Sequence, residues 1–152
     1  NTTGMIVTSI KVDGKTVDLN AAPSRRNDPP ALKASGLAST IATISLLDPI
    51  KSGSTAELEI EWNTKLPGGD NGHGHRMTQR FDSTLFQPTQ WFPRLAKYDD
   101  LRGWETSLYL GPAEFFNNFG KFDVSITVPA GWIVSGTGVL QNSKEVLTPT
   151  AI

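Results

Sequence analysis

Hydrophobic and polar residues alternate most regularly in the stretch Lys121–Leu140. Between residues 121 and 128, apolar side chains occupy the even positions and polar side chains the odd positions. Because successive side chains of a strand point to opposite faces, this pattern predicts a strand with one buried face and one wet face. Pro129-Ala130-Gly131 predicts a turn, and the β-branched run Trp132–Leu140 predicts a second strand. The stretch as a whole is therefore predicted to form a β-hairpin.

A second alternating run, Ala56–Trp62, is predicted to pack against the apolar face of that hairpin. Its three odd-numbered glutamates form a row on one strand face. Residues on the same strand face stand too far apart to close around one cation, so the row is interpreted as a soluble outer face. Phe92 and Trp132 are assigned to the core as well. The central members of this predicted core are Phe122, Val124, Ile126 and Val128 with Leu58, Ile60 and Trp62.

Turn signals elsewhere in the chain favour an all-β fold. Asp13-Gly14 lies between the strand-like runs Met5–Val12 and Lys15–Asn20 and predicts a type I′ hairpin, which needs positive φ at both turn residues. The 14 glycines and 10 prolines also suit a chain with many turns. We predict an antiparallel β-sandwich forming a single domain over residues 1–152. Further strands are expected at Thr40–Leu47, near Phe81, near Leu85-Phe86 and at Glu105–Leu110, with one helical turn at Pro112–Phe119.

The charge and residue composition of the chain exclude some classes of binding partner. The formal net charge of -1 offers no basic field for nucleic acid, and no apolar run is long enough to span a membrane. With no cysteine there is neither a disulfide framework nor a thiolate metal site. The chain opens at Asn1 without an initiator Met, so we expect a mature or excised portion of a longer protein. Nothing in the sequence separates bacterial cytoplasm from periplasm.

Catalytic signatures are missing from the sequence. His73 and His75 sit in a glycine-rich loop, and neither precedes a glutamate, so the H-E-x-x-H zinc motif is absent. Two imidazoles on such a loop would hold a metal ion weakly, and the loop is interpreted as solvated. Asp99-Asp100 is interpreted as a turn, since adjacent side chains in an extended chain point apart. No residue of the chain is assigned as catalytic or as a metal ligand.

Two segments carry a resemblance to a known family. Residues 122–140 read Phe-Asp-Val-Ser-Ile-Thr-Val-Pro-Ala-Gly-Trp-Ile-Val-Ser-Gly-Thr-Gly-Val-Leu. This segment resembles part of the N-terminal β-sandwich domain of the aminopeptidase N family of zinc metallopeptidases, the gluzincins. Gln90-Trp91-Phe92-Pro93 is similar to the Trp/Phe-Pro motif of the same domain. The likeness is clearest over Gln90–Asn142. The family's usual Cys-x-Asp-x-Pro after Phe-Pro is replaced here by Arg94–Asp99.

The resemblance implies a non-catalytic scaffold domain. Such a domain packs on a downstream catalytic domain of the same chain and helps to wall the cleft for peptide substrates. The zinc ion, its ligands and the general base would then lie beyond Ile152, outside this chain. The family's first domain also lends a Gln or Glu to the substrate's free α-amine from just before Phe-Pro. Gln87 and Gln90 occupy that segment, although the family's exact text is missing, and the alternative is that both side chains simply satisfy nearby backbone groups.

The aromatic residues suggest a second hypothesis for the function. Trp91 and Trp104 lie in a short interval crowded with aromatic side chains, and each fits a core position as well as an interface position. The alternative hypothesis is therefore a stand-alone glycan- or protein-binding β-sandwich module, in which exposed aromatic residues form the ligand-binding face.

Overall fold

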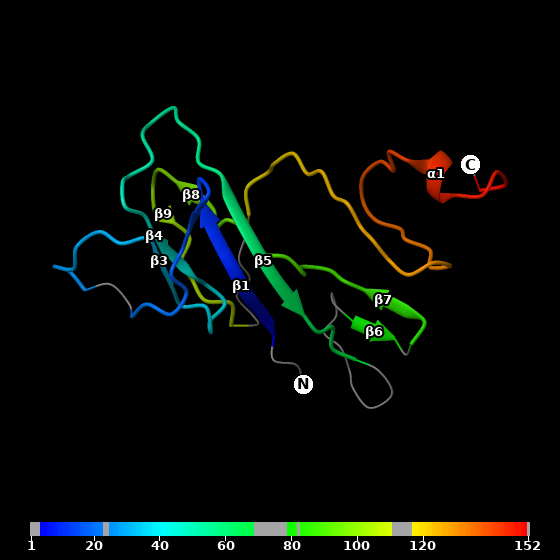
Figure 1. Ribbon diagram of the computed structural model, residues 1–152, viewed down its shortest axis with the longest axis horizontal. Coiled ribbons are helices and arrows are strands. Elements are labelled where there is room, and N and C mark those ends of the chain that lie inside the picture. The colour runs from blue at the N-terminus through cyan, green and yellow to red at the C-terminus, as the bar shows by residue number, and fades with distance from the viewer. Residues whose placement is uncertain (1–3, 23–24, 69–78, 82, 111–116, 152) are drawn as a thin grey trace. The chain divides into compact units, whose positions relative to one another are not determined.

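A computed structural model describes residues 4–22, 25–68, 79–81, 83–110 and 117–151 (Figure 1). Within these ranges the chain forms nine short strands, all in antiparallel pairs, and one short helix. The chain divides into two units, Asn1–Asn118 and Phe119–Ile152, and each is described by itself.

The largest sheet of the first unit has three strands in the order β2-β1-β5. β1 (Met5–Val12) pairs antiparallel with both β2 (Lys15–Thr16) and β5 (Leu58–Thr64). Asp13 and Gly14 link β1 to β2 with φ of 48° and 75°, which is the positive-φ pair that a type I′ turn requires. The hairpin predicted at Asp13-Gly14 is confirmed.

The same turn is tied to the start of β5. The Asp13 backbone N–H donates to the Glu57 carbonyl oxygen at 2.9 Å, and the Glu57 N–H donates to Asp13 Oδ1 at 2.8 Å. One residue therefore shapes the β1–β2 turn and fixes the entry of a strand that is remote in sequence.

The core of the first unit lies where β1 meets the segment after β2 and the strand β3 (Lys33–Ser35). Ile10, Val17 and Ala34 are its fully buried side chains among the described residues, at 3%, 2% and 1% exposure. β3 pairs antiparallel with β4 (Thr43–Ser45). Backbone hydrogen bonds from Asp18 N–H to the Leu32 carbonyl oxygen and from Ala34 N–H to the Asp18 carbonyl oxygen join β3 to the chain after β2.

Two further hairpins complete the first unit. β6 (Gln79–Phe81) pairs with β7 (Leu85–Gln87), which confirms the strands predicted near Phe81 and Leu85-Phe86. β8 (Tyr98–Asp99) pairs with β9 (Gly103–Trp104).

Several predicted boundaries differ from the structure. The strand predicted at Thr40–Leu47 forms only over Thr43–Ser45, as β4. The strand predicted at Ala56–Trp62 begins and ends two residues later, at Leu58–Thr64, as β5. The strand predicted at Glu105–Leu110 is wrong, because no strand forms there. The helical turn at Pro112–Phe119 falls mainly on residues outside those described.

The second unit corrects the hairpin prediction for Lys121–Leu140. The predicted turn is present, since Trp132 N–H donates to the Pro129 carbonyl oxygen at 3.3 Å, but no strand forms on either side of it. The helix α1 (Ser143–Val146) lies closer to the C-terminus. Alternation specifies which face of a strand is apolar, whereas strand formation also needs a neighbour in register.

The core prediction fails for the same segment. Phe122, Val124, Ile126 and Val128 are 67%, 59%, 55% and 40% exposed, and Trp132 is 41% exposed. In the first unit the predicted alternation of faces along β5 is confirmed, because Ile60 and Trp62 are half-buried while the glutamates beside them are exposed. Leu58, at the strand's start, is 40% exposed. Phe92 is half-buried.

The fold class is all-β, built from small antiparallel sheets. Among the described residues there are one three-stranded and three two-stranded sheets, and no pair of sheets is shown to close into a sandwich. The single-domain assignment stays a prediction.

Two truncations of the same residue type separate the observed core from the predicted one. We expect Ile10→Ala to lower the free energy of unfolding by about 2–5 kcal/mol, because it opens a cavity at a fully buried site. Ile126→Ala should change it by less than about 0.5 kcal/mol, as is usual at exposed positions. Urea unfolding of the chain measures both, and equal losses for the two variants would contradict this assignment of the core.

Candidate functional site

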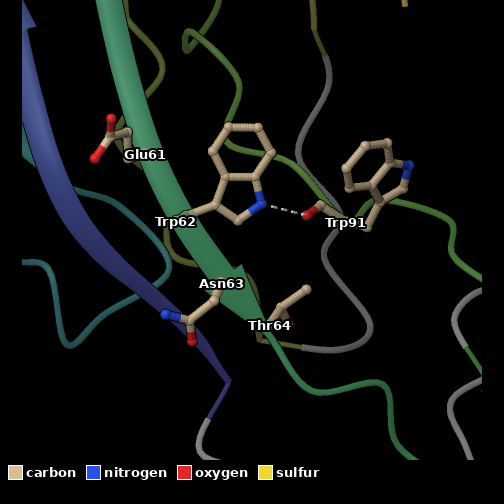
Figure 2. Close-up of a pocket in the computed structure, with 5 residues that line it drawn as sticks. All are labelled: Glu61, Trp62, Asn63, Thr64 and Trp91. Atoms are coloured by element: carbon tan, nitrogen blue, oxygen red, sulfur yellow. Dashed lines mark hydrogen bonds between the residues drawn. The ribbon is translucent and has the colours of Figure 1, made fainter. Parts of the chain in front are cut away.

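A shallow surface depression of the first unit runs along the C-terminal half of β5. It has a volume of ≈ 500 Å³, is open to solvent and is lined by Glu61, Trp62, Asn63, Thr64 and Trp91. Figure 2 shows the Trp62 and Trp91 side chains on one side of β5, with β1 on the other. The lining thus consists of four consecutive residues of β5 and one tryptophan from the Gln90–Pro93 segment.

The two tryptophans are held by a directional contact. Trp62 Nε1–H donates to the Trp91 carbonyl oxygen at 3.0 Å, and the ring centroids lie 6.1 Å apart at an interplanar angle of 42°. Trp91 in turn meets Phe92 edge-on at 5.5 Å, and the Arg94 guanidinium lies 4.9 Å from the Phe92 ring centroid. Tilted and edge-on aromatic pairs are favourable arrangements, and a cation over a ring adds to them. The segment that carries the Trp-Phe-Pro motif is therefore anchored to β5.

The polar face of β5 is acidic. Lys11 Nζ lies 3.1 Å from Glu59 Oε2 across the β1–β5 ladder, which neutralises one carboxylate. Glu61 lies opposite Ser9, which carries no charge. The depression is thus bordered by an exposed carboxylate whose cross-strand neighbour offers no compensating cation.

The glutamines predicted to bind substrate are both exposed. Gln87 ends β7, and Gln90 lies in the connection to Trp91 with φ of 49°. Their exposure leaves both amides able to reach a ligand, and no observation tests a contact with a substrate. Their role stays a prediction.

The predicted interface tryptophans differ in their surroundings. Trp91 is half-buried and lines the depression, whereas Trp104 in β9 is 51% exposed. Trp104 packs edge-on against Tyr98 with centroids 5.1 Å apart. The structure places the two tryptophans in separate aromatic groups, and an interface role for either stays a prediction.

Asp99 organises the β8–β9 hairpin. Its Oδ1 accepts the backbone N–H of Leu101 at 3.0 Å and of Arg102 at 2.7 Å, and Lys97 Nζ donates to its Oδ2 at 3.2 Å. The turn predicted for Asp99-Asp100 is confirmed. The Arg102 N–H and then the Lys97 ammonium lower the pKa of Asp99, because both stabilise the charged carboxylate. The side-chain and backbone groups of Ser107 similarly lower the pKa of Glu105.

Clustered metal ligands and long apolar helices are both absent from the described ranges. Across those ranges no three His, Cys, Asp or Glu side chains gather in a way that could hold a metal ion. His73 and His75 lie outside the described residues. No helix in the described part of the chain has the length and apolarity to cross a membrane.

Sequence reasoning missed Trp62 and its neighbours Asn63 and Thr64 as surface residues of the depression. The alternation of β5 assigned Trp62 to the core, and the structure leaves it half-buried at the edge of the sheet. Its position near the end of a strand, followed by polar residues, was the available signal.

No protein family, no curated protein and no solved structure matches this chain in the comparisons.

The Asp99 hydrogen bonds predict an acid-sensitive hairpin. Because the folded-state pKa is lowered, the carboxylate's contribution to stability is fully present above the unfolded-state pKa and is lost as pH falls through the folded-state pKa. An NMR titration of the Asp99 carboxyl should give a pKa below the reference value of 3.8. In Asp99→Asn the β8–β9 amide shifts should lose this acid transition. A wild-type midpoint at or above the reference value would contradict it.

Proposed function

We propose that this chain is a non-catalytic β-sandwich domain of an aminopeptidase-N-like zinc metallopeptidase. In this proposal it packs on a separate catalytic domain of the same protein and helps to shape the cleft that receives peptide substrates. Closure of the small sheets into a sandwich is part of the proposal.

The observation that carries the proposal is the apolar face of the segment 122–128. Four alternating apolar side chains on this segment are 40–67% exposed. Large apolar side chains that are exposed this close together in the chain favour a role in contacting another protein surface. The same residues begin the stretch 122–140 that resembles the family's β-sandwich domain, so the chemistry of the face and the resemblance support the same role.

Zinc belongs to the other domain in this proposal. The described residues do not gather a ligand set for it, so they do not fit the ion. In the family that the chain resembles, the metal supplies an activated water for peptide hydrolysis in the catalytic domain. In this proposal the chain contributes a surface on which the catalytic domain packs and part of the boundary of the substrate cleft.

The alternative is a stand-alone glycan- or protein-binding module. The Trp62–Trp91 depression favours it, because tilted indoles beside polar groups form a surface on which a sugar ring can stack. Glycan-dependent quenching of tryptophan fluorescence in residues 1–152, abolished by Trp91→Ala, would support the module and count against the scaffold.

The direct test compares the 152-residue chain with the protein encoded by its gene when translated beyond Ile152. We expect the longer protein to contain H-E-x-x-H and to hydrolyse aminoacyl anilides, with activity lost to a chelator and restored by zinc. The 152-residue chain should neither hydrolyse these substrates nor retain stoichiometric zinc after dialysis, as measured by elemental analysis. A longer protein without zinc-dependent hydrolysis, or tightly held zinc in the short chain, would overturn the proposal.

The glutamine hypothesis is tested in the longer protein. Gln87→Ala or Gln90→Gly should lower kcat/KM for substrates with a free α-amine and spare N-blocked ones, because an amide oxygen accepts a hydrogen bond from an ammonium group. Glycine is chosen at position 90 because Gln90 has a φ of 49°, and glycine adopts positive φ without the steric cost that alanine would have there. Steady-state kinetics on matched substrate pairs measures the difference. An equal loss on both substrate types would reject the role.

A further inference from the structure

β5 is the edge strand of the three-stranded sheet. Its neighbour in the described structure is β1, and no described strand pairs with its outer side. A strand of 7 residues with an open side presents backbone N–H and C=O groups that can pair with another extended chain.

The hydrogen bonds of β5 show which residues face outward. The Glu57 carbonyl oxygen accepts Asp13 N–H, and the Glu61 carbonyl oxygen accepts Thr8 Oγ1–H at 3.2 Å, so the odd-numbered backbone groups point toward β1. Alternate residues of an antiparallel strand direct their backbone groups to opposite sides. The backbone groups of Ile60 and Trp62 are therefore directed to the outer edge.

The side chains along that edge favour a particular occupant. On one face lie Ile60 and Trp62, and Trp62 borders the depression together with Trp91. On the other lie Glu59, which is neutralised by Lys11, and Glu61, which lies opposite an uncharged serine. A strand docked here would place its own side chains within about 4.5–5.5 Å of these residues, Cβ to Cβ. A basic residue opposite Glu61 and an apolar residue beside Trp62 complement both faces.

A second copy of β5 complements the edge less well. Antiparallel pairing centred on Ile60 would place Glu59 of each copy opposite Glu61 of the other, and like charges directly opposite are destabilising.

We propose that the outer edge of β5 binds an extended peptide segment of another protein as an additional antiparallel strand. A Lys or Arg of that segment pairs with Glu61, and an apolar side chain enters the Trp62–Trp91 depression. The inference does not rest on the proposed function, because it uses only the edge, its acidic row and the depression.

The experiment uses two seven-residue probe peptides and amide hydrogen exchange. The first is Thr-Lys-Val-Lys-Val-Lys-Thr, and the second has glutamate in place of each lysine. At saturation the lysine peptide should slow exchange at Ile60 and Trp62 by about tenfold or more, which corresponds to about 1.4 kcal/mol. Exchange at Glu59 and Glu61, whose amides face β1, should change little. A lysine peptide N-methylated at its pairing positions should give no protection.

Variants then test the recognition. Glu61→Lys should reverse the preference between the two peptides, whereas Glu145→Lys, a charge reversal at an exposed residue of α1, should leave it unchanged. Trp91→Ala should weaken binding of the lysine peptide.

Three results would overturn the proposal. Strong protection of Ile60 and Trp62 without peptide would show that another part of this chain already occupies the edge. The same protection accompanied by dimerisation in sedimentation would assign the edge to a second copy. If both peptides bind equally and Glu61→Lys changes neither affinity, the acidic residues of β5 do not distinguish basic from acidic peptides.

Discussion

The pairing of β1 with β5 is the interaction on which the rest of the first unit depends. It joins two strands that are separated in sequence by residues 13–57, so its ladder of hydrogen bonds must offset the entropy lost when these distant segments are brought together. Asp13 assists at the point of closure, where its backbone and side chain both bond to Glu57. β1 in turn carries Ile10, so the strand that pairs with β5 also supplies the centre of the core.

Sequence reasoning succeeded where the determining interactions are local. Asp13-Gly14 needs only its own backbone preferences to specify a turn, and the structure has that turn. The phase of β5 follows from alternation, which places Ile60 and the glutamates on opposite faces without reference to any partner. The Asp99-Asp100 turn is local in the same way, because the carboxylate bonds to amides two and three residues ahead.

Prediction failed where the structure depends on pairing between distant segments. The run 121–128 alternates as well as β5 does, yet β5 meets β1 in register and 121–128 forms no strand. Alternation carries no information about which segment pairs with which. The candidate site shows the same limit. Trp91 was identified from its motif, but its contact with Trp62 joins two segments that the sequence alone does not bring together.

The small core and the two kinds of exposed surface have different physical meanings. Ile10, Val17 and Ala34 are the fully buried apolar residues among those described, so much apolar surface faces solvent. On the segment 122–128 the exposed groups are side chains, whose burial is non-directional and roughly proportional to area. A folded protein surface of matching shape can cover such a face. Along β5 the exposed groups are backbone donors and acceptors, which require a partner that is extended and in register. A folded domain suits the first kind of surface and a single strand suits the second, so the two proposals name different partners.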